Sequence, residues 1–95
     1  MDRITPAEYA TAVTACVALA QYPTGGGRVA AQVLLSAYNG DSFQLDITSL
    51  CNLDNENYAH ALDVIRGRYE VGQEPQQMIP MAAVYFGHCG RNGRG

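Results

Sequence analysis

The first hydrophobic pattern along the chain predicts an amphipathic helix that begins after Thr5. Thr5 is a suitable N-cap, Pro6 suits the first helical position, and Glu8 can complete a capping box. Apolar residues then recur at helical spacing and form one face, which consists of Tyr9, Val13, Cys16, Val17 and Ala20. We expect Pro23 and the three glycines at 25–27 to end this helix and break the chain.

A second periodic segment predicts a helix from about Gly27 or Arg28 to Tyr38. Its inward stripe consists of Val29, Ala30, Val33, Leu34 and Ala37, and Leu35 and Tyr38 widen it. We therefore expect this helix to be the central and most buried element. Asn39 and Gly40 follow it, and these residues tolerate the left-handed conformation that often ends a helix.

The next segment predicts an extended connector over 43–46 and two more helical segments. Phe43 and Leu45 are expected to reach the core from the connector. Asp46 is a suitable N-cap for a short helical turn over 47–50, and Asp54 for a longer helix. The apolar face predicted for that longer helix consists of Tyr58, Ala61, Leu62, Ile65 and Tyr69, and Gly67 should weaken its last turn.

The remaining sequence predicts little regular structure before a final helix. Residues 71–74 are expected to form a loop, Pro75 to open a turn, and the last helix to begin near Pro80. Four glycines in the nine residues at 87–95 predict a mobile tail. The predicted fold is therefore all-α, a small irregular or orthogonal bundle of about four helices with a short extended connector. It forms one domain over 1–86, followed by the tail at 87–95.

Charge and composition exclude several functional classes. The 95 residues carry a formal net charge of -3, and all six cations are arginine, which disfavours nucleic-acid binding. Weak binding through Arg66, Arg68, Arg91 and Arg94 stays an alternative. No apolar stretch reaches the roughly 20 residues that span a bilayer, and no signal peptide is evident. Three widely spaced cysteines suggest reduced thiols, so we expect a cytoplasmic protein without membrane contact.

Three sequence motifs carry a resemblance to a known family. The chain reads Gly-Arg-Val-Ala over 27–30 and Tyr-Asn at 38–39, followed by Phe-Gln-Leu-Asp-Ile-Thr-Ser-Leu over 43–50. Across about residues 24–70 it resembles a small domain family of unknown function, encoded on proteobacterial plasmids, integrating elements and prophages. The resemblance implies an accessory protein of a mobile genetic element. By analogy, such small acidic proteins often inhibit a host complex, including CRISPR interference.

Six residues are candidates for partner binding, on composition and position. They are Tyr58, Arg66, Arg68, Tyr69, Asp41 and Glu56. Tyrosine and arginine are enriched in interface hot spots, and acidic residues can face a basic partner. The alternative for each is core packing, helix capping or an ordinary hydrated surface. The expected partner is a protein, either a host complex or a second copy that forms a homodimer through an alanine-rich helix.

Other candidate sites lack the pattern that their chemistry requires. Residues 24–28 could hold an anion at a helix start, but they match neither nucleotide-binding fingerprint. His88 and Cys89 could bind zinc with Cys51 or His60, but close-spaced ligand pairs are missing.

A polar face formed by Glu56, His60 and Asp63 would need a nucleophile such as Cys51, but nothing in the sequence places Cys51 beside it. We therefore expect no catalytic, metal or cofactor site. A small thiol- or zinc-dependent sensor or enzyme is the alternative function.

Overall fold

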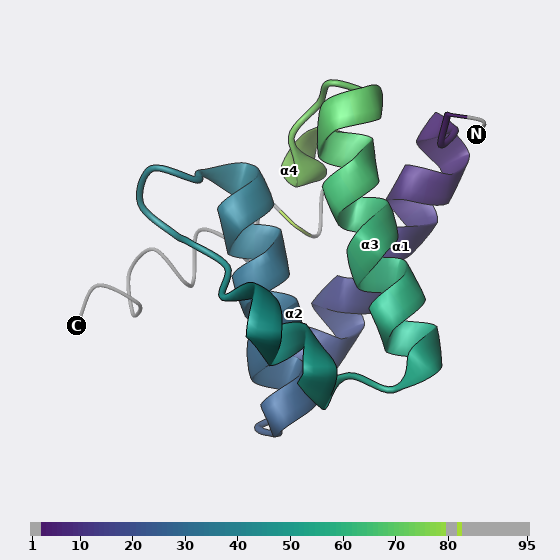
Figure 1. The fold of residues 1–95 in the computed structure, drawn as a ribbon. Helices are drawn as coiled ribbons and strands as arrows, with labels where there is room; N and C mark the ends of the chain where they lie inside the picture. Colours follow the sequence, from purple (N-terminus) through teal and green to yellow (C-terminus); the bar gives the residue numbers. More distant parts are fainter. Residues whose placement is uncertain (1–2, 80–81, 83–95) are drawn as a thin grey trace.

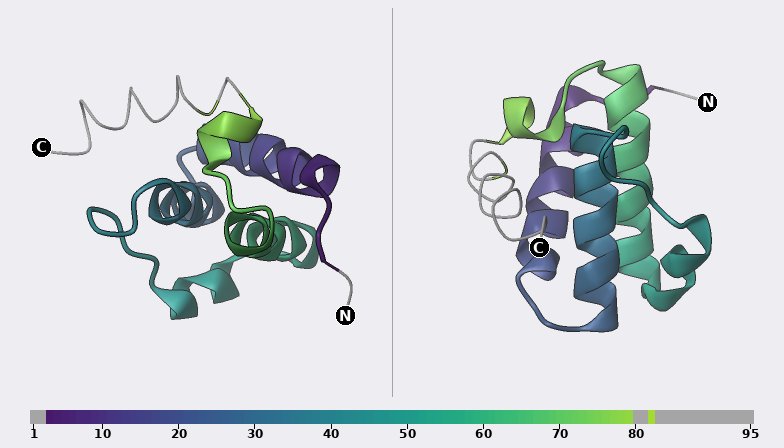
Figure 2. Two further views of the ribbon diagram at one scale, coloured as in Figure 1. Left: turned by 90° about the horizontal axis from the view of Figure 1, so that it is seen from above. Right: turned by 90° about the vertical axis from the view of Figure 1, so that its left-hand side faces the viewer.

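The computed structural model describes residues 3–79 and Ala82, and every regular element in that part is helical. The elements are α1 (Pro6–Ala20), α2 (Gly25–Tyr38), the short 3-10 helix η1 (Ile47–Asn52), α3 (Asn55–Glu70) and α4 (Pro75–Met78). Helix α1 packs against both α2 and α3, and α4 covers α1 and α2 at one end (Figures 1 and 2). This arrangement confirms the all-α bundle.

The start of α1 follows from the sequence at Thr5. The Thr5 hydroxyl accepts a hydrogen bond from the Glu8 amide at 3.1 Å, and the Glu8 carboxylate accepts one from the Thr5 amide at 2.9 Å. These two bonds complete the predicted capping box. Donation from the Thr5 amide, and then from the Thr5 hydroxyl, to the carboxylate holds the pKa of Glu8 below its ordinary value, because both favour the ionised form.

The glycines at 25–27 do not break the chain, and this part of the sequence prediction is wrong. They form the first turn of α2, which begins at Gly25 because the Thr24 hydroxyl accepts a hydrogen bond from the Gly27 amide at 3.0 Å. A Cβ at residue 27 would lie 2.1 Å from the Tyr22 carbonyl oxygen. The glycine is therefore required by the close approach of the α1–α2 connection, and it does not act as a helix breaker.

The end of α2 also differs from the expectation. Asn39 has a φ of −151°, so it does not adopt the left-handed conformation. Its side-chain oxygen accepts hydrogen bonds from the amides of Asp41 and Ser42 instead, and the chain leaves the helix through this local turn. Within residues 3–79 and Ala82, only Gly72, just after α3, has a positive φ, at 81°.

The core lies where α1, α2 and α3 meet. The five residues predicted for the inward stripe of α2 are all buried. The largest fully buried aliphatic side chains come from all three helices and comprise Val13, Val17, Val33, Leu34 and Val64. Helix α2 is central as expected, since it contacts α1, α3, α4 and η1, and α1 is equally central because it contacts α2, α3 and α4.

Tyr9 and Gly67 form a close contact between α1 and α3. A Cβ at residue 67 would lie 2.2 Å from carbons of the Tyr9 ring, so only glycine lets the ring lie flat against α3. The Tyr9 hydroxyl donates a hydrogen bond to the Gln73 carbonyl oxygen at 2.8 Å. Burial raises the pKa of Tyr9 to about 12.

The segments outside the three long helices follow the prediction in part. Leu45 packs against the core and Phe43 is half-buried. Pro75 begins the one-turn helix α4, where the sequence suggested a turn. The predicted helix start at Pro80 and the tail at 87–95 lie outside the described residues, while Ala82 is helical and buried.

Candidate functional site

An apolar groove opens to solvent between η1 and the beginning of α3. It has a volume of about 370 Å³ and is lined by Ile47, Leu50, Cys51, Leu53, Asn55 and Tyr58. Ile47 exposes 74% of its surface and Tyr58 exposes 42%. Large apolar side chains at this exposure contribute little to the core, so the groove is a candidate binding surface.

Two aspartates hold the walls of this groove in place. The Asp46 carboxylate accepts hydrogen bonds from the Thr48 amide (3.1 Å) and hydroxyl (2.7 Å), which starts η1. The Asp54 carboxylate accepts one from the Asn57 amide at 2.9 Å, which starts α3. Both caps were predicted. Between them, Leu50 and Leu53 pack against the core and attach the floor of the groove to the bundle.

Of the apolar face predicted for α3, Ala61 is buried in the core but the larger side chains are not, which corrects the sequence interpretation. Tyr58, Ile65 and Tyr69 are exposed, Tyr69 by 85%. The buried residues of α3 are Ala61, Val64 and Gly67, because small side chains let α1 approach closely. The exposed residues and the half-buried Leu62 share helical spacing, so they form an apolar row along α3 that begins in the groove at Tyr58.

The arginines among the predicted partner-binding residues are used within the fold. Arg66 pairs with Glu70 through two hydrogen bonds, of 3.0 and 3.2 Å. Arg68 donates to the Ala37 carbonyl oxygen at 2.9 Å and so satisfies the end of α2. Glu70 accepts a further bond from the Ile4 amide at 2.6 Å. Arg66 and this amide together hold the pKa of Glu70 below its ordinary value.

The six predicted residues do not form one cluster. Glu56 and Tyr58 lie in the first turns of α3, whereas Arg66, Arg68 and Tyr69 lie in its last turns. Asp41 lies in the turn that follows α2. The sequence analysis did not single out the groove residues Ile47, Leu50 and Leu53, and it considered Cys51 only for metal binding or as a nucleophile. The sequence feature that could have indicated them is the apolar content of the short segment between the two N-capping aspartates, Asp46 and Asp54.

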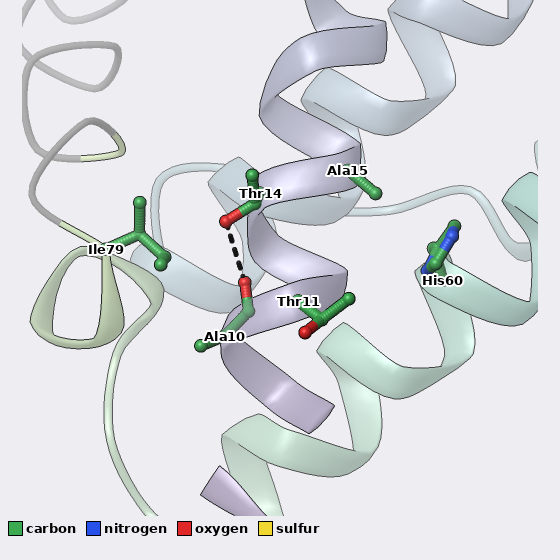
Figure 3. Close-up of a pocket in the computed structure, with 6 residues that line it drawn as sticks. All are labelled: Ala10, Thr11, Thr14, Ala15, His60 and Ile79. Carbon is green, nitrogen blue, oxygen red and sulfur yellow. Dashed lines mark hydrogen bonds between the residues drawn. The ribbon is translucent and has the colours of Figure 1, made fainter. Parts of the chain in front are cut away.

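A second, shallower depression lies on the outer face of α1. It has a volume of about 460 Å³ and is lined by Ala10, Thr11, Thr14, Ala15, His60 and Ile79. Figure 3 shows His60 and Ile79 on opposite sides of α1. The Thr14 hydroxyl donates to the Ala10 carbonyl oxygen at 2.9 Å, so it is engaged within its own helix.

The predicted polar face of α3 lies partly against α1. His60 and Asp63 are half-buried and share a pocket with Glu8 and Thr11, while Glu56 is exposed. Cys51, the nucleophile considered for this face, lines the separate groove at η1. The structure therefore places Cys51 in a different pocket from His60.

The cysteines and histidines show no metal-binding arrangement in the described part of the chain. Residues 3–79 and Ala82 contain no group of three or more potential ligands in reach of one ion. Cys16 is buried, and burial raises the pKa of its thiol to about 12. His88 and Cys89 lie outside the described residues.

The glycine-rich segment at 24–28 forms a capped helix start. The Thr24 hydroxyl already accepts from the Gly27 amide, and Arg28 is exposed without an ion pair to any described residue. This geometry serves the close α1–α2 turn, and no second feature points to an anion.

Comparison with known proteins places the chain in a family. Residues 10–85 match a family of unknown function, DUF7673. The chain belongs to the DUF7673 family. The match begins after the first turn of α1 and extends past α4, well beyond the motifs at 27–50 that carried the resemblance.

Family membership adds no functional residue for this member of DUF7673. No curated protein and no solved structure matches the chain significantly. Among the described helices, none combines the length and the apolar character needed to cross a bilayer. The functional argument therefore depends on the surface of the bundle.

Proposed function

We propose that this protein is a non-enzymatic binding factor that acts by attaching to a partner protein. The observation that carries the proposal is the exposure of Ile47 (74%) in the groove and of Tyr69 (85%) in the apolar row of α3 that begins at the groove residue Tyr58. Apolar surface that is exposed and contiguous marks interaction sites on folded domains. Tyrosine in such a position is typical of binding hot spots.

The intramolecular contacts of Arg66 and Arg68 favour binding to a protein over binding to a nucleic acid. Arg66 pairs with Glu70, and Arg68 bonds to the α2 terminus. A nucleic-acid interface needs several cations that are free to neutralise phosphates. The net charge of -3 on this chain favours a partner protein whose binding surface is basic.

The biological setting that we propose is a mobile genetic element. This part of the proposal rests on the resemblance of residues 24–70 to proteins of plasmids, integrating elements and prophages. In that setting, the protein would occlude or bridge a host complex, and a defence complex such as CRISPR interference is the proposed target.

The test is purification of the tagged 95-residue chain from its native host, followed by reconstitution with the purified partner. We expect one protein partner at a defined stoichiometry, with a complex that reforms from the two isolated components. Recovery of no partner, together with turnover of a small-molecule substrate by the pure protein, would contradict the proposal.

A further inference from the structure

The groove between η1 and α3 is built before any partner arrives. Its two walls begin at the caps formed by Asp46 and Asp54, and its floor is fixed by Leu50 and Leu53. A partner therefore does not have to order this surface on binding, which removes a large entropic cost. Ile47 projects at one side with 74% of its surface exposed.

The apolar row along α3 extends this surface in one direction. Tyr58, Ile65 and Tyr69 follow at intervals of seven and four residues, with Leu62 between the first two. At 1.5 Å per residue the row is about 16 Å long. Side chains spaced in this way complement the apolar stripe of another helix laid alongside, because both follow the same helical period.

The segment of the chain that forms the groove carries acidic charge only. Residues 29–59 contain four acidic residues, Asp41, Asp46, Asp54 and Glu56, and no lysine, arginine or histidine. Asp46 directly precedes the groove residue Ile47, and Asp54 lies between the groove residues Leu53 and Asn55. Both capping aspartates are exposed. Beside the capping hydrogen bonds, their carboxylate oxygens can still accept hydrogen bonds from a cationic side chain.

We infer that the groove and the α3 row together bind an amphipathic helix of the partner protein that carries arginine or lysine beside its apolar stripe. This inference rests on the proposed function and specifies its binding site and the chemistry of its partner. The aliphatic or aromatic anchors of the partner fill the space between Ile47 and Tyr58. Its cations face Asp46 and Asp54, which fixes the direction of the helix.

A second copy of this chain fits the site less well. Of the three arginines in the described helices, Arg66 and Arg68 are held by intramolecular contacts, and Arg28 at the start of α2 is exposed without an ion pair to any described residue. The copy would also bring a second net charge of -3 to an acidic rim. Two like-charged surfaces oppose association unless opposite charges are paired across the interface.

The first experiment measures binding of designed peptides of about 18 residues by fluorescence anisotropy. One peptide has leucines on a helical stripe and arginines elsewhere, the second has glutamates in place of the arginines, and the third is a scrambled form of the first. We expect the first peptide to bind at least about tenfold more tightly than the scrambled form, which has the same charge. Equal binding of these two, or tighter binding of the acidic peptide, overturns the inference.

The second experiment places the peptide on the protein. We expect Ile47→Asp to weaken binding of the basic helix by about tenfold or more, as hot-spot truncations do. The double variant Asp46→Asn/Asp54→Asn keeps both caps but removes their charge, so it should reduce the salt dependence of binding. Tyr22→Ser removes an aromatic side chain that is 64% exposed outside the groove and should leave binding unchanged.

Two further measurements distinguish a partner helix in the groove from a second copy of this chain. In a Cys89→Ser background, bound peptide should slow alkylation of Cys51, which lines the groove. Sedimentation should show a monomer. A dimer of the wild type that dissociates on Ile47→Asp identifies a second copy as the occupant and overturns the inference.

The native partner distinguishes this inference from the proposed function. A reconstituted complex that is weakened by Ile47→Asp and not by Tyr22→Ser supports both. A complex that tolerates Ile47→Asp overturns the site and leaves the binding function standing. If no partner forms a complex at all, the proposed function fails whatever the peptides do.

Discussion

Gly67 shows how one missing side chain sets the distance between two helices. In an ordinary helix interior, alanine is more favourable than glycine by about 1 kcal/mol. Here the added carbon would lie 2.2 Å from the Tyr9 ring, which is itself fully buried and bonded to Gln73. The ring cannot retreat without losing that hydrogen bond, so packing outweighs helix propensity at this residue.

We therefore expect Gly67→Ala to lower the free energy of unfolding by about 1–3 kcal/mol, the usual cost of overfilling a core. The matched control is Gly25→Ala, since a Cβ there meets no atom within 4 Å. Urea denaturation measures both. A Gly67→Ala protein as stable as the control would show that α1 and α3 can separate without cost.

The two described cysteines should differ sharply in reactivity. Cys51 is exposed in the groove, whereas Cys16 is 3% exposed and burial raises its pKa to about 12. The thiolate is the reactive form, so Cys16 is protected by both exclusion and protonation. In a Cys89→Ser background, we expect a thiol reagent at pH 8 to label Cys51 rapidly and Cys16 only after unfolding.

The control for this experiment is Cys51→Ser in the same background. This variant should lose the rapid labelling and keep only the labelling of Cys16 that follows unfolding. Fast labelling of two thiols in the native Cys89→Ser protein would mean that the core around Cys16 opens far more readily than its burial implies.

At the scale of elements, Glu70 joins the end of α3 to the start of the chain. It accepts from Arg66 and from the Ile4 amide, and both contacts lower its pKa from the ordinary 4.5. A carboxylate with a lower pKa in the folded state stabilises the protein above its unfolded pKa. That contribution is lost as the pH falls below about 4.5 and the native carboxylate takes up its proton.

We expect Glu70→Gln to reduce stability at pH 7 and to make the loss of stability between pH 5 and 3 shallower than in the wild type, because a charged group is removed. The measurement is the free energy of unfolding in urea across this range. Glu56→Gln serves as the control, since Glu56 is exposed and accepts no hydrogen bond from a described residue. Parallel pH curves for wild type and Glu70→Gln would contradict the expectation.

The helix starts could be predicted from the sequence because their causes are local. Thr5, Asp46 and Asp54 each bond to an amide two or three residues further along the chain. The orientation of α3 could not be predicted in the same way. Its most apolar face was expected inside, but contact with Tyr9 requires Gly67, and this turns Tyr69 outward. Such a long-range contact leaves no local pattern.

The candidate site was predicted in part for a related reason. Tyr58 and Tyr69 were named because tyrosine is common in interfaces, and both are exposed. Ile47 was missed, since an isoleucine in a short helical turn reads as a core residue. Only the packed bundle shows that Leu50 and Leu53 reach the core from η1 while Ile47 does not.

At the scale of the whole molecule, stability and binding surface are carried by different residues. The core of the described bundle contains no buried charged side chain and is made of small and medium apolar groups. Ile47 and Tyr69 contribute almost nothing to it, because most of their surface stays in water. A domain that keeps such residues for its own stability would bury them.

This separation predicts that Ile47→Ser and Tyr69→Ser change the free energy of unfolding by no more than about 0.5 kcal/mol, the range of ordinary surface substitutions. Leu34→Ala, at a residue with no exposed surface, should instead cost about 2–5 kcal/mol. Denaturation of the three purified variants measures this. If Ile47→Ser or Tyr69→Ser destabilised the protein as much as Leu34→Ala, their exposed side chains would serve the fold, and the argument for a binding surface on η1 and α3 would lose its basis.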